Sequence, residues 1–224
     1  MTTTPSKNKY NIIEIAASTA FGSQRDYGSH PVPITQTGEF ELPELIAQPF
    51  PDYIPPISEF RKWGRWRQDK QSEAWIHYAA DVKLSSLLRD PQMLVQSGAK
   101  ITTEINCSSF SDDPLPVALP TLWRKRCISR CWQDQGIQVA IDLNVEGWTR
   151  KLVFEGVPTD HSLFATRFIT QKGVKGLIDD FALITDHVQS GTKTLLLVYG
   201  GGKQIADLCA EYGWLHLPPI NGRR

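Results

Sequence analysis

The sequence has no excess of charge of either sign, few cysteines and no long apolar run. Lysine plus arginine and aspartate plus glutamate each number 24, so net charge gives nucleic-acid binding no support and any basic surface must be local. Four cysteines without a framework spacing are typical of a reducing compartment. The apolar run 12–20 contains Glu14, is too short to span a bilayer and lacks the layout of a secretory signal. We therefore expect a soluble cytoplasmic protein with no membrane partner.

Several motifs that would identify an enzyme are also missing. The chain has no GxSxG elbow and no HExxH pair. Its glycine run lacks the GxxxxGK spacing of a P-loop, and Gln204 stands where Ser or Thr would reach a metal ion. Cys127 and Cys131 lie one helical turn apart, but no second spaced pair accompanies them. We therefore predict buried, inert thiols and no cysteine metal site.

The clearest pattern in the chain is a strand, a glycine turn and a helix near its end. Leu195 to Tyr199 are five consecutive apolar or aromatic residues, which predicts a strand buried on both faces of a parallel sheet. Gly200 to Gly202 then break the strand. A helix follows, with one apolar face at the i, i+3, i+4 and i+7 positions: Ile205, Leu208, Cys209 and Tyr212. Gly213 stands where a left-handed cap would end it.

The rest of the chain repeats this alternation. Strands are expected at 74–80, 101–106, 136–144, 151–157, 162–168 and 214–217, and helices from 84, from 91, at 120–135 and at 174–188. This predicts one α/β domain over 61–224 with a mostly parallel sheet, open or closed into an incomplete or irregular (β/α) barrel, in which 195–199 is central. Residues 1–60 are rich in proline and predict an extended N-terminal arm.

Polar residues follow several of these strands. The carboxyl ends of parallel strands meet at one edge, so that edge would gather carboxylates, amides and a cation: Asp81, Glu104, Asn106, Asp142, Asn144, Arg167 and Tyr199. Asp81, Glu104, Asp142 and Arg167 are the candidate catalytic residues, for acid–base work or for an Mg²⁺ ion held through oxygen. The alternative is that they cap loops and helices.

The glycine turn is a candidate ligand-binding segment. Backbone N–H groups at a helix start can bind phosphate, and a lysine there adds positive charge. The candidate ligand-binding residues are Tyr199, Gly200, Gly201, Gly202 and Lys203. A purely structural glycine turn is the alternative.

Two stretches mix cations with indole rings. The first is Arg61, Lys62, Trp63, Arg65, Trp66 and Arg67, and the second is a helical stripe with Trp123, Arg124, Arg126 and Arg130. Cations can contact phosphates while indole faces stack on bases, so these residues are candidates for nucleic-acid binding. The alternative places the tryptophans in the core and the arginines in solvent.

From Trp75 onward a series of short motifs follows a recognisable order. They are the His77-Tyr78-x-x-Asp81 run, the helix start at Pro91, the Asp112-x-Pro114 turn, Trp123-Arg124-x-Arg126, Gly136-Ile137-x-Val139, Gly156-Val157-Pro158 and Val198-Tyr199-Gly200. In this order they resemble the uncharacterised bacterial and phage family catalogued as domain of unknown function 4417. That family's Pro-Asp-x-Ser strand end is replaced here by Thr103, Glu104, Ile105 and Asn106. The resemblance implies a compact α/β domain often carried by phages and other mobile elements.

Three functions remain open at this stage. The first is a phage- or plasmid-associated protein that binds nucleic acid in replication or its control. The second is an enzyme acting on a small phosphorylated or nucleotide ligand at the carboxyl ends of the strands. The third is a non-catalytic interaction module. The sequence leaves the oligomeric state open.

Overall fold

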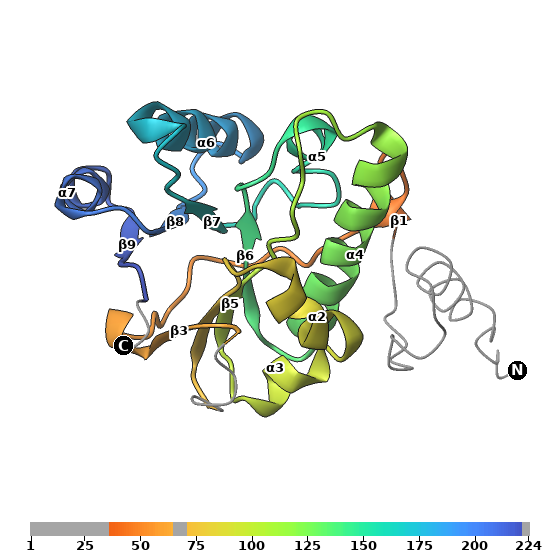
Figure 1. Cartoon of the computed structure of the whole chain (residues 1–224), viewed down its shortest axis with the longest axis horizontal. Coiled ribbons are helices and arrows are strands. Elements are labelled where there is room, and N and C mark those ends of the chain that lie inside the picture. The colour runs from red at the N-terminus through yellow and green to blue at the C-terminus, as the bar shows by residue number, and fades with distance from the viewer. Residues whose placement is uncertain (1–35, 65–70, 221–224) are drawn as a thin grey trace, which may run out of the picture.

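Seven parallel strands form one sheet in the computed structural model, which describes residues 36–64 and 71–220. The strands are neighbours in the order of the chain: β3 (Phe60–Lys62), β4 (Ala74–Ile76), β5 (Ile101–Thr103), β6 (Gln138–Asp142), β7 (Leu163–Arg167), β8 (Leu195–Tyr199) and β9 (Leu215–Leu217). The sheet curls until β3 and β9 approach each other (Figure 1). The predicted α/β class, parallel sheet and incomplete barrel are therefore confirmed.

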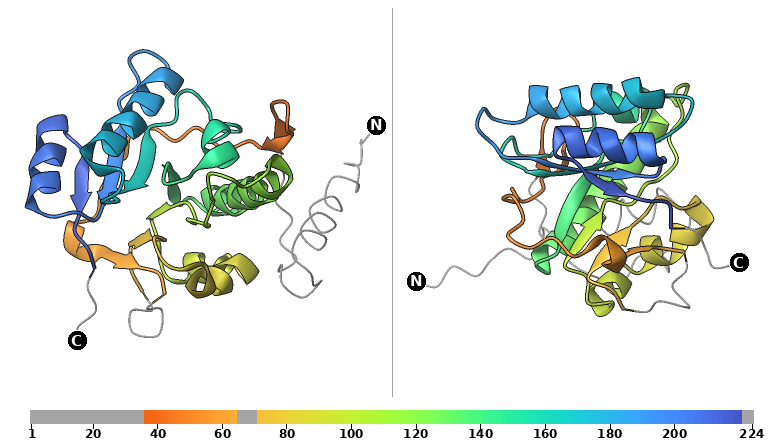
Figure 2. Two further views of the ribbon diagram at one scale, coloured as in Figure 1. Left: turned by 45° about the horizontal axis from the view of Figure 1, so that its top comes forward. Right: turned by 90° about the vertical axis from the view of Figure 1, so that its left-hand side faces the viewer.

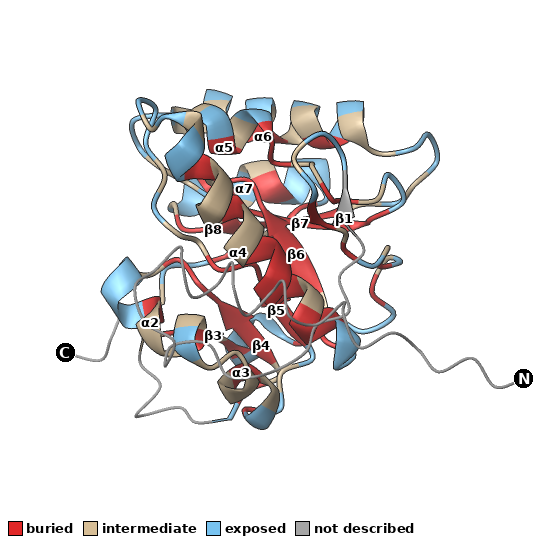
Figure 3. Ribbon diagram, turned by 90° about the vertical axis from the view of Figure 1, so that its right-hand side faces the viewer, coloured by how far each residue is buried: buried red, intermediate tan, exposed pale blue. Residues whose placement is uncertain are grey.

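Helices cover the outside of this curled sheet (Figure 2). They are α2 (Asp81–Arg89), α3 (Gln92–Gln96), α4 (Leu115–Asp134), α5 (Gly147–Lys151), α6 (Gly173–His187) and α7 (Lys203–Tyr212). Each helix turns its exposed side to solvent, whereas the strands from β4 to β8 are almost wholly buried (Figure 3). Within the described residues, no helix has both the length and the apolar composition of a membrane span.

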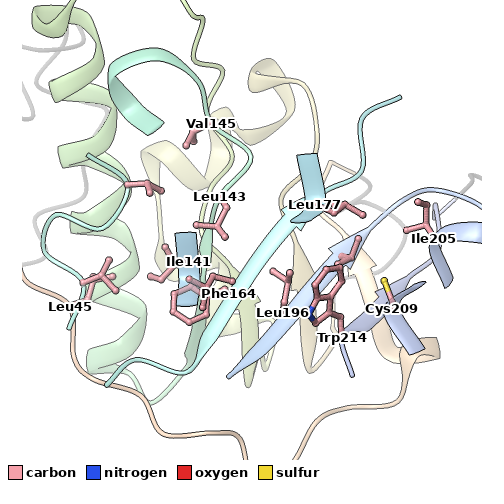
Figure 4. Packing of buried hydrophobic residues seen from close by; sticks show 14 residues of the cluster. Leu45, Ile141, Leu143, Val145, Phe164, Leu177, Leu196, Ile205, Cys209 and Trp214 are labelled. Atoms are coloured by element: carbon pink, nitrogen blue, oxygen red, sulfur yellow. The ribbon is translucent and has the colours of Figure 1, made fainter. Parts of the chain in front are cut away.

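The core has an inner and an outer part because side chains alternate across a strand. The inner cluster contains residues of all seven strands, among them Phe60, Ala140 and Leu217, and no helical residue, so it fills the barrel. One outer cluster joins Phe164 and Leu196 to α6 and α7 (Figure 4), and another packs β4 and β6 against α2, α3 and α4. Burial on both faces explains why 195–199 is continuously apolar.

The N-terminal arm lies on the body where it is described. A short hairpin, β1 (Gln36–Thr37) with β2 (Leu42–Pro43), precedes an extended stretch and a 3-10 turn, η2 (Ile57–Glu59). Gln48 donates to the Ile137 carbonyl (3.0 Å) and accepts from the Val139 N–H (2.8 Å). Its own carbonyl accepts from Ser162 Oγ (2.8 Å). The arm thus crosses the amino ends of β6 and β7.

Three expectations about individual elements were wrong. Helix α4 begins at Leu115, not at Pro120: Pro116 lies in its first turn, where a missing N–H costs nothing, and Pro120 lies inside the helix. No strand covers 151–157. Instead the chain turns there, and Gly156 has a φ of 75° and lies against the Pro43 carbonyl, where a side chain would collide. In the strand order β6 is in the middle and β8 is sixth, so 195–199 is not central.

The predicted cap of α7 is confirmed, and it allows a test. Gly213 has a φ of 71° and its N–H reaches the Cys209 carbonyl. Since nothing lies within 4 Å of a Cβ at this position, Gly213→Ala introduces only backbone strain. We expect it to lower the free energy of unfolding by roughly 1–2 kcal/mol in urea denaturation. Gly213→Asn should cost less, because asparagine tolerates this conformation. Equal losses for both variants would contradict the interpretation.

Candidate functional site

Asp142, the last residue of β6, is at the centre of a polar cluster at the carboxyl ends of the strands. Its Oδ1 accepts from the Tyr78 hydroxyl (3.1 Å) and the Asn144 N–H (3.0 Å). Its Oδ2 accepts from Asn106 Nδ2 (2.9 Å) and Lys125 Nζ (3.1 Å). Asp142 is fully buried. With four donors on two oxygens, this carboxylate serves to position its neighbours.

Glu104, which follows β5, is the second buried carboxylate. It contacts Arg126, accepts from Ser129 Oγ (3.0 Å) and from the Asp142 N–H (3.1 Å), and lies 3.9 Å from Lys125 Nζ. Burial acts to raise the pKa of Glu104, but the charges of Arg126 and Lys125 outweigh burial and lower it. Glu104 is therefore held in its charged form.

Glu104, Asp142, Lys125 and Arg126 together make the buried charge network. Each is at most 1% exposed, and two anions balance two cations. Both cations come from α4, whose buried face also carries Leu122 and Ser129. Arg126 donates in addition to the carbonyls of Val153 and Glu155. The network thus ties α4 to the ends of β5 and β6 and to the turn after α5.

Two tyrosines of the inner cluster lie at the mouth of the barrel, where β8 ends and where the chain leaves β4. Tyr78 and Tyr199 stack with ring centroids 5.5 Å apart and an angle of 13° between their planes. Lys62 Nζ lies 5.4 Å from the centroid of the Tyr199 ring. Burial, with the charge of Asp142 adding to it, raises the pKa of Tyr78 well above its usual value. The Tyr78 hydroxyl therefore stays protonated and donates a hydrogen bond to Asp142.

The glycine turn lies at the same edge, at the carboxyl end of β8. Gly200 and Gly201 have φ values of 93° and 80°, and a Cβ on Gly201 would come within 2.6 Å of Ile205. Gly200 donates to the Leu217 carbonyl (2.9 Å), and its own carbonyl lies 2.9 Å from His216 Nε2. Both contacts fix the turn against β9.

Several donors of this turn remain available. Within the described residues, no protein oxygen accepts from the backbone N–H groups of residues 201–204. Lys203 is exposed beside them, and Arg167, which is paired in register with Tyr199, is exposed on the neighbouring strand. Beside the glycine turn this edge, here called the rim, therefore presents the cations Arg167 and Lys203 and N–H donors, whereas the carboxylates of the network lie below it; the exposed carboxylate at the same edge of the sheet is Asp81, at the start of α2.

The four candidate catalytic residues lie at one edge of the sheet, but only two of them touch. Glu104 and Asp142 share the buried charge network. Asp81 is exposed at the start of α2 and accepts from Ser108 N–H (3.3 Å) and Oγ (3.1 Å), so it anchors a loop. Arg167 stays separate on β7. Among residues 36–64 and 71–220, no three His, Cys, Asp or Glu side chains are grouped to hold a metal ion.

The candidate nucleic-acid-binding residues do not form one exposed surface. Trp63 is 1% exposed and packs on Trp75, with centroids 5.0 Å apart, so the core alternative describes it correctly. Arg126 is buried in the network, where no phosphate can reach it. Arg130 pairs with Asp134 at 3.0 Å.

The other cations of the two stretches are at least partly engaged with protein. Arg124 donates to the Leu88 carbonyl (3.0 Å), Arg61 contacts the Ser58 carbonyl, and Lys62 lies over Tyr199. Arg65, Trp66 and Arg67 lie outside the described residues.

Lys125 and Tyr78 were not among the candidate site residues. A signal for Lys125 was available, because it follows Leu122 by three residues and precedes Ile128 by three, on the apolar side of the predicted helix. Tyr78 alternates with His77 at the end of the expected strand, but the sequence does not indicate that it would meet Asp142.

Comparison with known proteins gives a family and no activity. No curated protein and no solved structure matches the chain. The family described as Domain of unknown function (DUF4417) matches residues 34–209, a span that includes the buried charge network, the barrel mouth and the glycine turn. The chain belongs to this family, as the order of its short motifs had indicated.

Proposed function

We propose that this protein binds a small phosphorylated ligand, such as a nucleotide, at the carboxyl ends of its strands. The buried charge network is the observation that carries the proposal. Replacing buried ion pairs with well-packed apolar residues is often neutral or stabilising, so stability alone does not account for such a network. Clusters of buried ionisable groups concentrate at functional sites, and this one lies at the ends of β5 and β6, where α/β proteins bind their ligands.

The charges that reach solvent favour an anion. The carboxylates of Glu104 and Asp142 are neutralised inside the network, whereas Arg167 and Lys203 are exposed at the rim. Helix α7 begins at the same edge, so the N–H groups of residues 201–204 and the positive end of the helix dipole lie there. A phosphate there would accept from the backbone donors and pair with Lys203 and Arg167. The buried network below would hold the strand ends that carry these groups.

A small ligand fits this arrangement better than a nucleic-acid strand. A strand would need cations spread along a surface, and the burial of Arg126 removes the middle of the stripe on α4. Nucleic-acid binding and an association with mobile elements stay predictions from the sequence.

Titration calorimetry with inorganic phosphate and with adenosine monophosphate tests the proposal. We expect Arg167→Ala and Lys203→Ala each to weaken nucleotide binding roughly tenfold, because each removes one charge-assisted contact. Lys193→Ala is the matched control, since Lys193 is exposed at the opposite end of β8. It should leave affinity unchanged.

Two outcomes would refute the proposal. One is that neither phosphate compound binds. The other is that all three variants bind as the parent does, while a single-stranded oligonucleotide binds with a steep dependence on salt. The second outcome would restore the nucleic-acid interpretation.

A further inference from the structure

The last residues of β3, β7 and β8 lie on one side of the sheet, because side chains alternate across each strand. Phe60, two residues before Lys62, belongs to the inner cluster, and so does Ala165, two residues before Arg167. Tyr199 is itself a member of that cluster and pairs in register with Arg167. Lys62, Arg167 and Tyr199 therefore all face the inside of the barrel at its carboxyl end.

The two cations reach Tyr199 from different strands. Paired strands lie about 5 Å apart, so the backbone of Arg167 on β7 is directly beside that of Tyr199 on β8. Lys62 comes from β3, and its Nζ lies 5.4 Å from the centroid of the Tyr199 ring. Since β3 lies beyond β9 where the sheet curls on itself, this contact crosses the open side of the barrel (Figure 1). Tyr199 thus has a cation on each side at the mouth.

The hydroxyl of Tyr199 is open to a ligand. The residue is 5% exposed, and its ring is held by the stack on Tyr78. Within the described residues the Tyr199 hydroxyl makes no hydrogen bond, unlike the Tyr78 hydroxyl, which donates to Asp142. It is not an enclosed atom either, so the exposed part of the residue includes this oxygen. A fixed polar group without a partner, in a side chain that is otherwise buried, is typical of the few groups that orient a ligand.

The cations at the mouth and the rim have no carboxylate partner. In the described part of the chain, no Asp or Glu lies within salt-bridge distance of Lys62, Arg167 or Lys203. Asp142 ends β6 at the same edge, but its charge is balanced by Lys125 inside the buried charge network. The three cations therefore make this edge attractive to a ligand with more than one negative charge.

The donors form two groups on either side of the end of β8. The first group is the glycine turn, with the N–H groups of residues 201–204 and the Lys203 ammonium. The second is the Tyr199 hydroxyl with the Lys62 ammonium. Tyr199 and Gly201 are two residues apart, so their Cα atoms are at most about 7 Å apart. Two phosphate groups joined by a bridging oxygen could contact both groups of donors, whereas a single phosphate at the turn would leave the second group unused.

We infer that Lys62 and the Tyr199 hydroxyl take up a second phosphate group, so that the site selects a nucleoside diphosphate over a monophosphate. This rests on the proposed function, in which the turn, Lys203 and Arg167 bind the first phosphate. The second phosphate lies over the mouth of the barrel, where it accepts from the hydroxyl and pairs with Lys62.

Calorimetric titration of the full chain with adenosine monophosphate and adenosine diphosphate, without divalent cations, tests this inference. Charge-assisted hydrogen bonds are the strong ones, so we expect the parent to bind the diphosphate more than about tenfold more tightly. Lys62→Met should lower this ratio of affinities roughly tenfold, and Tyr199→Phe, which removes only the hydroxyl, should lower it several-fold. Arg167→Ala and Lys203→Ala should weaken the binding of both nucleotides.

Each test variant has a matched control. Lys193 also lies over an aromatic ring, 3.8 Å from the Phe50 centroid, but at the opposite end of β8. Tyr212 is an exposed tyrosine at the end of α7. Lys193→Met and Tyr212→Phe should both keep the ratio of the parent.

Three results would overturn the inference. They are equal affinity of the parent for the two nucleotides, an unchanged ratio in a folded Lys62→Met or Tyr199→Phe variant, and an equal fall in the two controls. Circular dichroism shows whether each variant is folded, and because the two residues lie on different strands, one variant still provides the test if the other unfolds. Monophosphate binding that depends on Arg167 and Lys203, without preference for the diphosphate, would refute this inference and leave the proposed function standing. Binding of neither nucleotide would refute both.

Discussion

Arg126→Met is expected to lower the free energy of unfolding by about 3–5 kcal/mol, measured by urea denaturation. The substitution keeps the apolar volume of the side chain but leaves Glu104 without its contacting cation in a fully buried position. The carbonyls of Val153 and Glu155 also lose a donor. Lys125 remains, but it lies 3.9 Å from Glu104 and is closer to Asp142.

The matched control is Arg130→Met, one turn further along the same helix. Arg130 is partly exposed, pairs with Asp134 and donates to the Glu44 carbonyl, so its replacement should cost less, about 1–2 kcal/mol. The double variant Glu104→Gln with Arg126→Met should recover part of the loss, because it removes the unpaired charge. Equal destabilisation by the two single arginine variants would show that the buried charge network does not behave as described.

Acidification from pH 7 to pH 4 should remove several kcal/mol of stability through two buried histidines. Burial lowers the pKa of His77 from 6.5 to about 4, and it does the same for His161. Each imidazole accordingly stays neutral in the folded protein at pH values where the unfolded chain already binds a proton. Their contribution is fully present above pH 6.5 and is lost as the pH falls towards 4. The loss is about 3 kcal/mol for each histidine.

The measurement is the free energy of unfolding in urea at several pH values. His77 packs between Trp63 and Trp132, and His161 packs against Phe164, so glutamine at either position will also change the absolute stability. The informative quantity is therefore the slope of the free energy of unfolding against pH. The carboxylates contribute equally to this slope in the parent and in each variant. His77→Gln and His161→Gln should each flatten it between pH 6.5 and 4. Identical slopes in parent and variants would contradict the assignment.

The fold could be predicted from the sequence wherever a local pattern of apolar residues and glycines determines the secondary structure. The strand 195–199 and helix α7 with its Gly213 cap follow from a continuous apolar run, a helical stripe and a terminal glycine. Helix α5 and the turn after it could not be predicted this way. Their apolar residues, Leu152 and Val153, are buried by contacts with distant parts of the chain, and the turn is imposed by the close approach of Pro43 to Gly156.

The candidate site, too, could be predicted only in part. The rule that parallel strands end at one edge was enough to place Glu104 and Asp142 together. It could not show that α4 supplies two cations to them, because that depends on which side of α4 faces the sheet. Arg126 belongs to a row of charges that indicates a solvated or phosphate-binding face, and only its contact with Glu104 reveals that it points inward.

The contacts of Gln48 bear on the order in which the protein folds. Each strand of the sheet pairs with the strand that precedes it in the chain, so the sheet can grow one strand at a time through contacts much closer in sequence than those of Gln48. Gln48 instead bonds Ile137, Val139 and Ser162, which are 89, 91 and 114 residues away. Its partners come into register only once β6 and β7 have paired. We infer that the arm docks late, although it is synthesised before the strands whose amino ends it closes.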